Sequence, residues 1–244
     1  MAPIQVAIIS VGSLKYPFDF RKLTTWQSKI VQISHGPSIE HLPNAQGPDW
    51  TYPDAQLSAL IRAVPNSNIT LALVNVPLQD NYYLRRLNSN VAVLSFFEMA
   101  EIARAFHFTI ECYVLRNIHE IAVLFAANGG LIPANAITWA HDDVRGCLFD
   151  MNASKLDIIF SMHKPTLCPE CSNRLHSKQI DPSFLPNLRT ELGRIRKTLY
   201  FRAAEWVQVH PLWALAVTAA FGVILNFAAS VLFEKAKHVL PWLS

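Results

Sequence analysis

Two short apolar runs, residues 69–76 (ITLALVNV) and residues 91–95 (VAVLS), decide the fold class that the sequence predicts. Short apolar runs of this kind are typical of strands buried inside a sheet. Helical patterns follow at residues 97–106 and 111–127, and Asn-Gly-Gly at 128–130 is a strong signal for a helix end. Strands therefore precede helices, and we expect an α+β domain with mixed α/β character.

The beginning of the chain fits the same domain. Residues 4–11 form an apolar, β-branched run closed by Gly12, and residues 29–34 (KIVQIS) form a second one, so both are predicted strands. No basic segment precedes the first run, which excludes the pattern of a signal peptide. We expect one cytoplasmic domain over residues 1–180.

The charge of the chain argues against one class of partner. Its 244 residues carry a net charge of +3, and no stripe of Lys and Arg interleaved with aromatic residues occurs in the globular part. We therefore expect no nucleic-acid partner.

A long uncharged segment lies near the C-terminus. Residues 211–233 (PLWALAVTAAFGVILNFAASVLF) contain no Asp, Glu, Lys or Arg. At about 1.5 Å per residue this length is enough to cross a bilayer core of roughly 30 Å. We expect a single-pass transmembrane helix here; the alternative is a buried core helix.

The charges that flank this segment predict its orientation. Residues 181–210 read as a basic amphipathic linker helix, and the tail at 234–244 carries fewer basic residues. Because basic residues stay on the cytoplasmic side, the main domain is expected in the cytoplasm and the tail outside. The predicted location is the inner or plasma membrane.

Small or polar residues recur along the predicted span at every fourth position, which places them on one stripe of the helix: Ala214, Thr218, Gly222, Asn226 and Ser230. Such stripes let two helix backbones approach closely, and Asn226 has the chemistry to hydrogen-bond across the contact. The stripe favours a homo-oligomer formed through this helix; the alternative is the ordinary use of small residues in membrane spans.

Three of the four cysteines have a spacing that suits a metal. Cys168-Pro-Glu-Cys171 presents two thiolates to one ion, and Cys147 supplies a third about 20 residues earlier. His141, Asp142 and Asp143 are the nearest candidates for the fourth ligand. Soft thiolates favour zinc in a structural site. The alternative is a reduced Cys-x-x-Cys in a loop with Cys147 buried; Cys112 is expected in the core.

Three segments carry a resemblance to a known family: residues 116–125 (RNIHEIAVLF), residues 147–152 (CLFDMN) and residues 168–175 (CPECSNRL). Together they resemble the archaemetzincins, a cysteine-bearing branch of the zincin metallopeptidases. That family carries HExxHxxGxxH, followed by Cys-x4-Cys-Met-Asn and a later Cys-x-x-Cys. The resemblance implies a zincin-like domain with a zinc knuckle.

The catalytic half of the motif is incomplete in this chain. In HExxH two histidines share a helix face and bind zinc, while the Glu activates the bound water. His119 and Glu120 occupy the first two positions, but Val123 stands at the second histidine and Gly129 at the third. Val123 has no atom that binds zinc, so the three-histidine site cannot form.

A second alignment places His141 at the third histidine, which removes the motif because Leu131, Ile132 and Asn135 then occupy the His, Glu and His positions of HExxH. In both alignments Asp142 stands where the family has its first structural cysteine. The resemblance then implies a structural zinc held by Cys147, Cys168 and Cys171 with Asp142 or His141.

Two interpretations of His119 and Glu120 remain open. They can combine with His141 and Asp142 in an atypical catalytic site, with Glu120 as the base. Alternatively they form the polar side of an amphipathic helix with an apolar face at Ile118, Ile121, Leu124 and Phe125.

Three functions fit these features. The first is a membrane-anchored binding or sensing module, with structural zinc, that has lost peptidase activity and binds a protein partner. The second is a membrane effector, in a stress or anti-phage response, that acts by self-association of its transmembrane helix. The third is an active but atypical zinc peptidase.

Overall fold

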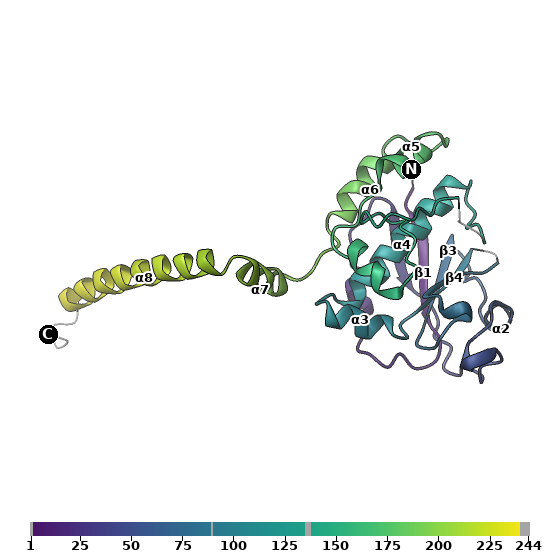
Figure 1. The fold of residues 1–244 in the computed structure, drawn as a ribbon, viewed down its shortest axis with the longest axis horizontal. Helices are drawn as coiled ribbons and strands as arrows, with labels where there is room; N and C mark the ends of the chain where they lie inside the picture. The colour runs from purple at the N-terminus through teal and green to yellow at the C-terminus, as the bar shows by residue number, and fades with distance from the viewer. Residues whose placement is uncertain (1, 89, 135–137, 240–244) are drawn as a thin grey trace. The chain divides into compact units, whose positions relative to one another are not determined.

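The computed structural model describes residues 2–88, 90–134 and 138–239 of the chain. It divides into two compact units, Met1–Lys197 and Thr198–Ser244. The first unit is built on a five-stranded sheet, and the second contains two helices (Figure 1). Mixed α/β architecture is thereby confirmed.

The sheet has the strand order β2-β1-β3-β5-β4. Its strands are β1 (Ile4–Ser10), β2 (Val31–His35), β3 (Ile69–Val74), β4 (Leu84–Arg86) and β5 (Val91–Ser95). The first, second, third and fifth strands run parallel, and β4 pairs antiparallel with β5 at one edge. All residues of β3 and β5 are buried, as the apolar runs at 69–76 and 91–95 predict.

The two faces of the sheet are covered by different parts of the chain. Successive side chains of a strand point to opposite faces, so Leu71 and Leu73 enter one core cluster while Ala72 and Val74 enter the other. The larger cluster contains the long helix α4 (Ile110–Ala127), and the smaller one contains Leu57 of α2 (Asp54–Leu60). The sheet is therefore the middle layer of the first unit.

Local signals define both ends of α4. The Thr109 hydroxyl accepts a hydrogen bond from the backbone N–H of Cys112 at the start of the helix. At its end Gly129 and Gly130 both take positive φ angles, of 64° and 89°, which glycine adopts without steric cost. The predicted helix at 111–127 is confirmed.

The remaining helices of the first unit are short: α1 (Phe20–Thr24), α3 (Met99–Ala105), α5 (Pro169–His176), α6 (Phe184–Leu192) and the 3-10 helices η1 (Pro48–Trp50), η2 (Gln79–Asn81) and η3 (Lys155–Ser161).

The predicted linker helix at 181–210 differs from the structure. This segment forms two helices, α6 in the first unit and α7 (Leu199–Val209) in the second. Phe184, Leu185 and Leu188 of α6 are buried in the main core, so α6 is part of the first unit, which extends to Lys197 instead of ending at residue 180. The apolar face of α6 is the physical reason, because burying it holds the helix against the domain.

The second unit consists of α7 and α8 (Pro211–Val239). Within α8, Pro211–Glu234 is long and apolar enough to cross a membrane. None of the most apolar stretch is buried, so the structure does not support the alternative of a core helix. The tail predicted at 234–244 continues α8 as far as Val239, and residues 240–244 lie outside the described residues.

The burial of α6 leads to a test of the boundary between the units. Replacing Leu188, which is fully buried, with Ala should lower the free energy of unfolding of the first unit by about 2–5 kcal/mol, because a cavity replaces packed side-chain atoms. Urea unfolding of the full chain in detergent measures this change. The matched change Leu199→Ala in α7, at a side chain that is 77% exposed, should leave the unfolding midpoint nearly unchanged. Equal effects of the two substitutions would contradict the assignment of α6 to the core.

Candidate metal centre

Four ligand atoms converge in the first unit, from His141, Cys147, Cys168 and Cys171. These atoms all lie within 4.8 Å of one another, and the three cysteines are buried. The residues come from two short bridged segments and from the start of α5. The structure thus brings together the three predicted cysteines and one of the predicted fourth ligands.

Backbone hydrogen bonds hold the first two ligands in place. His141 and Asp150 form an isolated bridge, in which the N–H of Met151 donates to the carbonyl of His141 at 2.9 Å. Cys147 forms a second bridge with Thr166, and Gly146 before it takes a φ of 73°. A side chain at Gly146 would be strained at this φ and would lie 3.1 Å from the Phe160 carbonyl.

The other two ligands form a knuckle at the start of α5. Cys168 is the N-cap residue, and its sulfur accepts a hydrogen bond from the N–H of Cys171 at 3.4 Å. The N–H of Cys168 donates in turn to the sulfur of Cys147 at 3.4 Å. Backbone N–H groups that point at sulfur stabilise negative charge there, so this arrangement suits thiolates.

The spacing of the four atoms fits a zinc ion. Zinc binds sulfur at about 2.3 Å and nitrogen at about 2.0 Å, so tetrahedral ligand atoms lie roughly 3.5–3.8 Å apart. The distance from His141 Nε2 to Cys168 Sγ is already 3.5 Å. Three thiolates and one imidazole are also the donor set that zinc prefers. This Cys3His cluster could therefore bind zinc, as predicted for the cofactor.

The residues of the cluster differ in how their pKa values are shifted. A hydrogen bond from the Cys171 thiol lowers the pKa of Cys147, and the same contact raises the pKa of Cys171. Burial alone would lower the pKa of His141, but the hydrogen bond to Cys147 raises it. Metal binding must therefore displace a proton from Cys171, because zinc binds the thiolate form.

Asp150 lies behind the histidine ligand, and the sequence analysis missed it. Its Oδ1 atom lies 3.4 Å from Nδ1 of His141 but has no hydrogen-bond partner among the described residues, while Nδ1 lies 3.2 Å from the backbone carbonyl oxygen of Asp143. The other oxygen accepts from the N–H groups of Arg145 and Cys147, at 3.0 and 2.9 Å. A carboxylate behind a metal-binding histidine orients its ring and raises its basicity. The Cys147-x-x-Asp150 spacing was the signal available in the sequence.

The predicted carboxylate alternatives are not ligands. Asp142 and Asp143 are exposed, and neither contributes an atom to the cluster. Asp143 pairs with Arg145, and hydrogen bonding from that guanidinium lowers the pKa of Asp143. Asp142 therefore lies outside the cluster, and His141 is its fourth residue.

The structure places His119 away from any metal cluster found among the described residues. Its side chain is fully buried in α4, with Nδ1 2.7 Å from the carbonyl oxygen of Leu115 and Nε2 3.0 Å from Oε2 of Glu191. Glu191, in α6, also accepts from the Ser28 hydroxyl and from the N–H of Lys29. These contacts join α4, α6 and the start of β2.

Glu120 belongs to a second buried network. Its carboxylate pairs with Arg116, which is fully buried, and lies 3.7 Å from Arg86 of β4. Burial alone would lower the pKa of Arg116. The negative charge of Glu120 outweighs this effect, so the pKa is raised and the guanidinium stays charged. The Arg116 guanidinium also donates to Ser161 and to the carbonyl of Leu148. The interpretation of His119 and Glu120 as the polar side of an amphipathic helix stays open, but this side does not face solvent, since both residues are buried.

The predicted catalytic trio does not share one set of partners. His141 belongs to the cysteine cluster, His119 pairs with Glu191, and Glu120 pairs with arginines. In the second alignment, Leu131 and Ile132 lie outside any helix, although HExxH requires one, and Asn135 lies outside the described residues.

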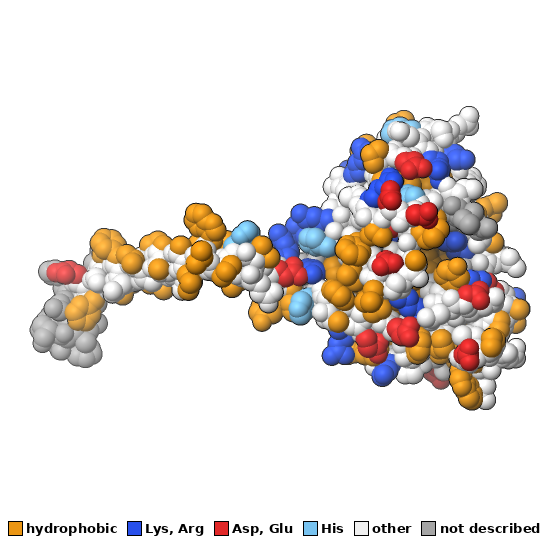
Figure 2. Space-filling model, in the orientation of Figure 1, with side chains coloured by type: hydrophobic (Ala, Val, Ile, Leu, Met, Phe, Trp, Pro, Cys, Tyr) orange, Lys and Arg blue, Asp and Glu red, His pale blue; other side chains and the backbone are white. Residues whose placement is uncertain are grey.

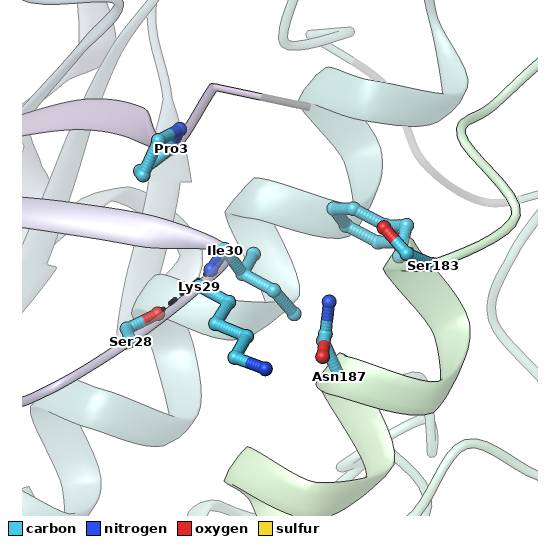
Figure 3. A pocket seen from close by; sticks show the side chains of 7 residues that line it. Pro3, Ser28, Lys29, Ile30, Ser183 and Asn187 are labelled. Carbon is cyan, nitrogen blue, oxygen red and sulfur yellow. Dashed lines mark hydrogen bonds between the residues drawn. The ribbon is translucent and has the colours of Figure 1, made fainter.

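No residue of the metal cluster lines either of two cavities found among the described residues of the first unit. A cavity of about 500 Å³ lies between the start of β2 and the start of α6, where Lys29, Ser183 and Asn187 line it (Figure 3). A larger one of about 740 Å³ is lined by the loops at 46–53 and 77–81 together with Phe97. Ser28 connects the smaller cavity to the His119–Glu191 network, since its hydroxyl donates to Glu191.

No family model matches the chain. No curated protein matches it either.

Solved structures with a similar fold include members of the family that the sequence motifs resemble. An archaemetzincin from Methanopyrus kandleri is 17% identical, with 72% of this chain and 95% of that chain covered and a TM-score of 0.45. A zinc-dependent peptidase from Methanocorpusculum labreanum is 13% identical, with 70% and 99% covered and a TM-score of 0.43. An archaemetzincin from Archaeoglobus fulgidus, complexed with malonate, is 16% identical, with 70% and 99% covered and a TM-score of 0.38.

The cluster predicts a difference between two neighbouring side chains. Replacing His141 with Ala should weaken zinc binding strongly, because it removes one of four ligands, whereas Asp142→Ala should leave zinc affinity unchanged. Competition with a chromogenic chelator measures both affinities on the full chain. A loss of zinc in the Asp142 variant, with retention in the His141 variant, would contradict the geometry.

Asp150 provides a separate test of the histidine support. Asp150→Asn should weaken zinc binding by about 10–100-fold, because the amide has no charge with which to hold the imidazole ring. The same chelator competition reports this change, and elemental analysis shows whether one zinc per chain remains at saturation. Asp157→Asn, at a carboxylate that caps η3, is the control and should leave the affinity unchanged.

Proposed function

We propose that the chain is a membrane-anchored binding or sensing module, in which a structural zinc holds a zincin-like domain that does not cleave peptides. The observation that carries this proposal is the burial of Glu120 and its pairing with arginines. The residue that would act as the catalytic base is buried and paired with two arginines.

The composition of the metal cluster supports a structural role for zinc. Four protein ligands complete a tetrahedral site, whereas catalytic zinc sites keep one position open for water or substrate. The buried cysteines and the backbone N–H groups at their sulfurs are also typical of a closed site. In this role zinc contributes folding free energy and supplies no reaction chemistry.

Three features of α4 support the loss of peptidase activity. Both ring nitrogens of His119 already face oxygen atoms of Leu115 and Glu191, which leaves neither for a metal. Val123, one turn later, offers no ligand atom. An atypical peptidase would need His119, Glu120 and His141 at one ion, and each has other partners in this structure.

The second unit supports membrane attachment. Pro211–Glu234 has the length and composition of a membrane span, and its apolar side chains are exposed (Figure 2). Basic residues are more frequent before this helix than after it, which favours a cytoplasmic first unit at an inner or plasma membrane.

We also propose that copies of the chain associate through α8. The hydroxyls of Thr218 and Ser230 donate to carbonyls of the same helix, at 2.8 and 2.9 Å, so they are already satisfied. Asn226 then remains as the polar side chain with two donors and an acceptor available for a second helix. The partner that the first unit binds is a protein in this proposal.

The state of Glu120 can be tested directly. Glu120→Gln should lower the free energy of unfolding by about 3 kcal/mol, because it leaves the buried Arg116 charge uncompensated. The zinc-loaded wild type should release no peptides from casein above the background of the zinc-free chain. Urea unfolding and a peptide-release assay on the full chain in detergent measure the two effects.

Glu101→Gln is the matched control, because this glutamate side chain is 53% exposed, and it should change neither measurement. Peptide release by the wild type that Glu120→Gln abolishes, without a change in unfolding, would establish the peptidase instead.

A further inference from the structure

Helix α7 has one continuous apolar face. Its residues lie at positions i, i+1, i+4, i+7 and i+8 of the helix: Leu199, Tyr200, Ala203, Trp206 and Val207. Residues at this spacing share one side of an α-helix. All five are exposed, Leu199 and Tyr200 by 77% and 75%. Within the second unit, no other helix covers this face.

The polar residues of α7 are confined to its other side. Arg202, Glu205 and Gln208 lie there together with Phe201, Ala204 and Val209, and Arg202 is next to the edge of the apolar face. An arginine at this edge can extend its charged end towards water or lipid phosphates while its stem covers apolar surface. Polar residues confined to one side are found in helices that lie in a membrane interface.

The connection to α8 gives the face a specific neighbour. Only His210, with non-helical angles of φ −127° and ψ 60°, separates α7 from α8. Pro211 then begins α8, and its missing N–H prevents one continuous helix. If Pro211–Glu234 crosses the bilayer, the C-terminal end of α7 lies at the level of the lipid headgroups. The 11 residues of α7 extend no more than about 17 Å from that end.

The charges around α7 indicate the type of lipid. Arg196 precedes the helix and Arg202 lies within it. Arg194 and Lys197 are also close in sequence, but Arg194 donates to the Gln27 carbonyl and the Lys197 ammonium lies over the Phe108 ring. Basic residues next to a membrane span are attracted to anionic headgroups. Trp206 adds an aromatic ring of the kind that is enriched at headgroup level, and it lies 5.9 Å from the ring of His210.

We propose that α7 lies flat in the headgroup layer of an anionic bilayer, with the face of Leu199, Tyr200, Ala203, Trp206 and Val207 in contact with lipid. This inference rests on the proposed membrane attachment through α8. It adds a second, peripheral contact that fixes the first unit close to the membrane surface.

Lipid contact can be measured at single positions of the full chain. Its four cysteines are buried, so an introduced exposed cysteine can be labelled selectively in the zinc-loaded protein. We would attach an environment-sensitive fluorophore to Ala203→Cys on the apolar face, to Gln208→Cys on the polar side as a matched control, and to Phe227→Cys within α8. The labelled chains are reconstituted into phosphatidylcholine vesicles with about 30% phosphatidylserine and lipids brominated at different depths.

The proposal predicts a distinct pattern for each label. The label at 203 should lose about half of its emission with bromine near the headgroups, while the label at 208 keeps nearly all of it. The label at 227 should be quenched by bromine near the bilayer centre. Vesicles of phosphatidylcholine alone should weaken quenching at 203, because the basic residues then lack anionic partners.

Two other patterns overturn the proposal in different ways. Quenching at 227 without any difference between 203 and 208 shows that α8 is inserted while α7 is away from lipid, covered by the first unit or by a second copy. Absence of quenching at 227 shows that α8 does not insert, which removes the membrane attachment itself together with the role of α7.

Discussion

The convergence of His141, Cys147, Cys168 and Cys171 is the constraint on which the second half of the first unit depends. Between α4 and α5, the described chain contains one 3-10 helix and two isolated bridges and belongs to no sheet. A structural zinc contributes on the order of 10–16 kcal/mol at neutral pH, which is comparable to the whole stability of a domain at about 5–15 kcal/mol. Zinc bound to this cluster would therefore stabilise the segment strongly. It also places α5, whose first turn supplies two of the ligands.

In α4, the His119-Glu120 pair that resembles the start of HExxH makes structural contacts inside the core. His119 and Glu120 are polar residues in a core, where an unpaired polar group costs free energy. The chain satisfies them with Glu191 from α6 and with Arg116 and Arg86. The result is a set of polar contacts that ties α4 to β4, to α6 and to the start of β2. Glu191 is the key residue of the set because it also receives hydrogen bonds from Ser28 and Lys29.

The two units divide the work that we propose for the chain. The first buries its apolar residues in two clusters on the faces of the sheet, whereas the second leaves them exposed along α7 and α8. Exposed apolar surface on this scale needs a partner, and a bilayer supplies one without any specific recognition. The connection at His210 and Pro211 joins α7 to α8 within the second unit, and Thr198 joins this unit to the first.

The sequence by itself determined the features that depend on local pattern. The buried strands at 69–76 and 91–95, the helix ended by Gly129 and the apolar segment at 211–233 follow from composition and periodicity within a few residues. The three cysteines were identified because thiolates at this spacing have few other uses.

Other features depend on the direction of a side chain and on contacts between residues far apart in the sequence, and these are seen in the tertiary structure alone. His141 and Asp142 are neighbours in the sequence, but the chain bends at Asp142, which is exposed, and only His141 reaches the cysteines. The roles of Asp150, Arg116 and Glu191 depend on their contacts with other side chains of the fold. Helix α6 joins the core because the domain offers it an apolar surface. A local sequence pattern encodes neither the contacts nor this surface.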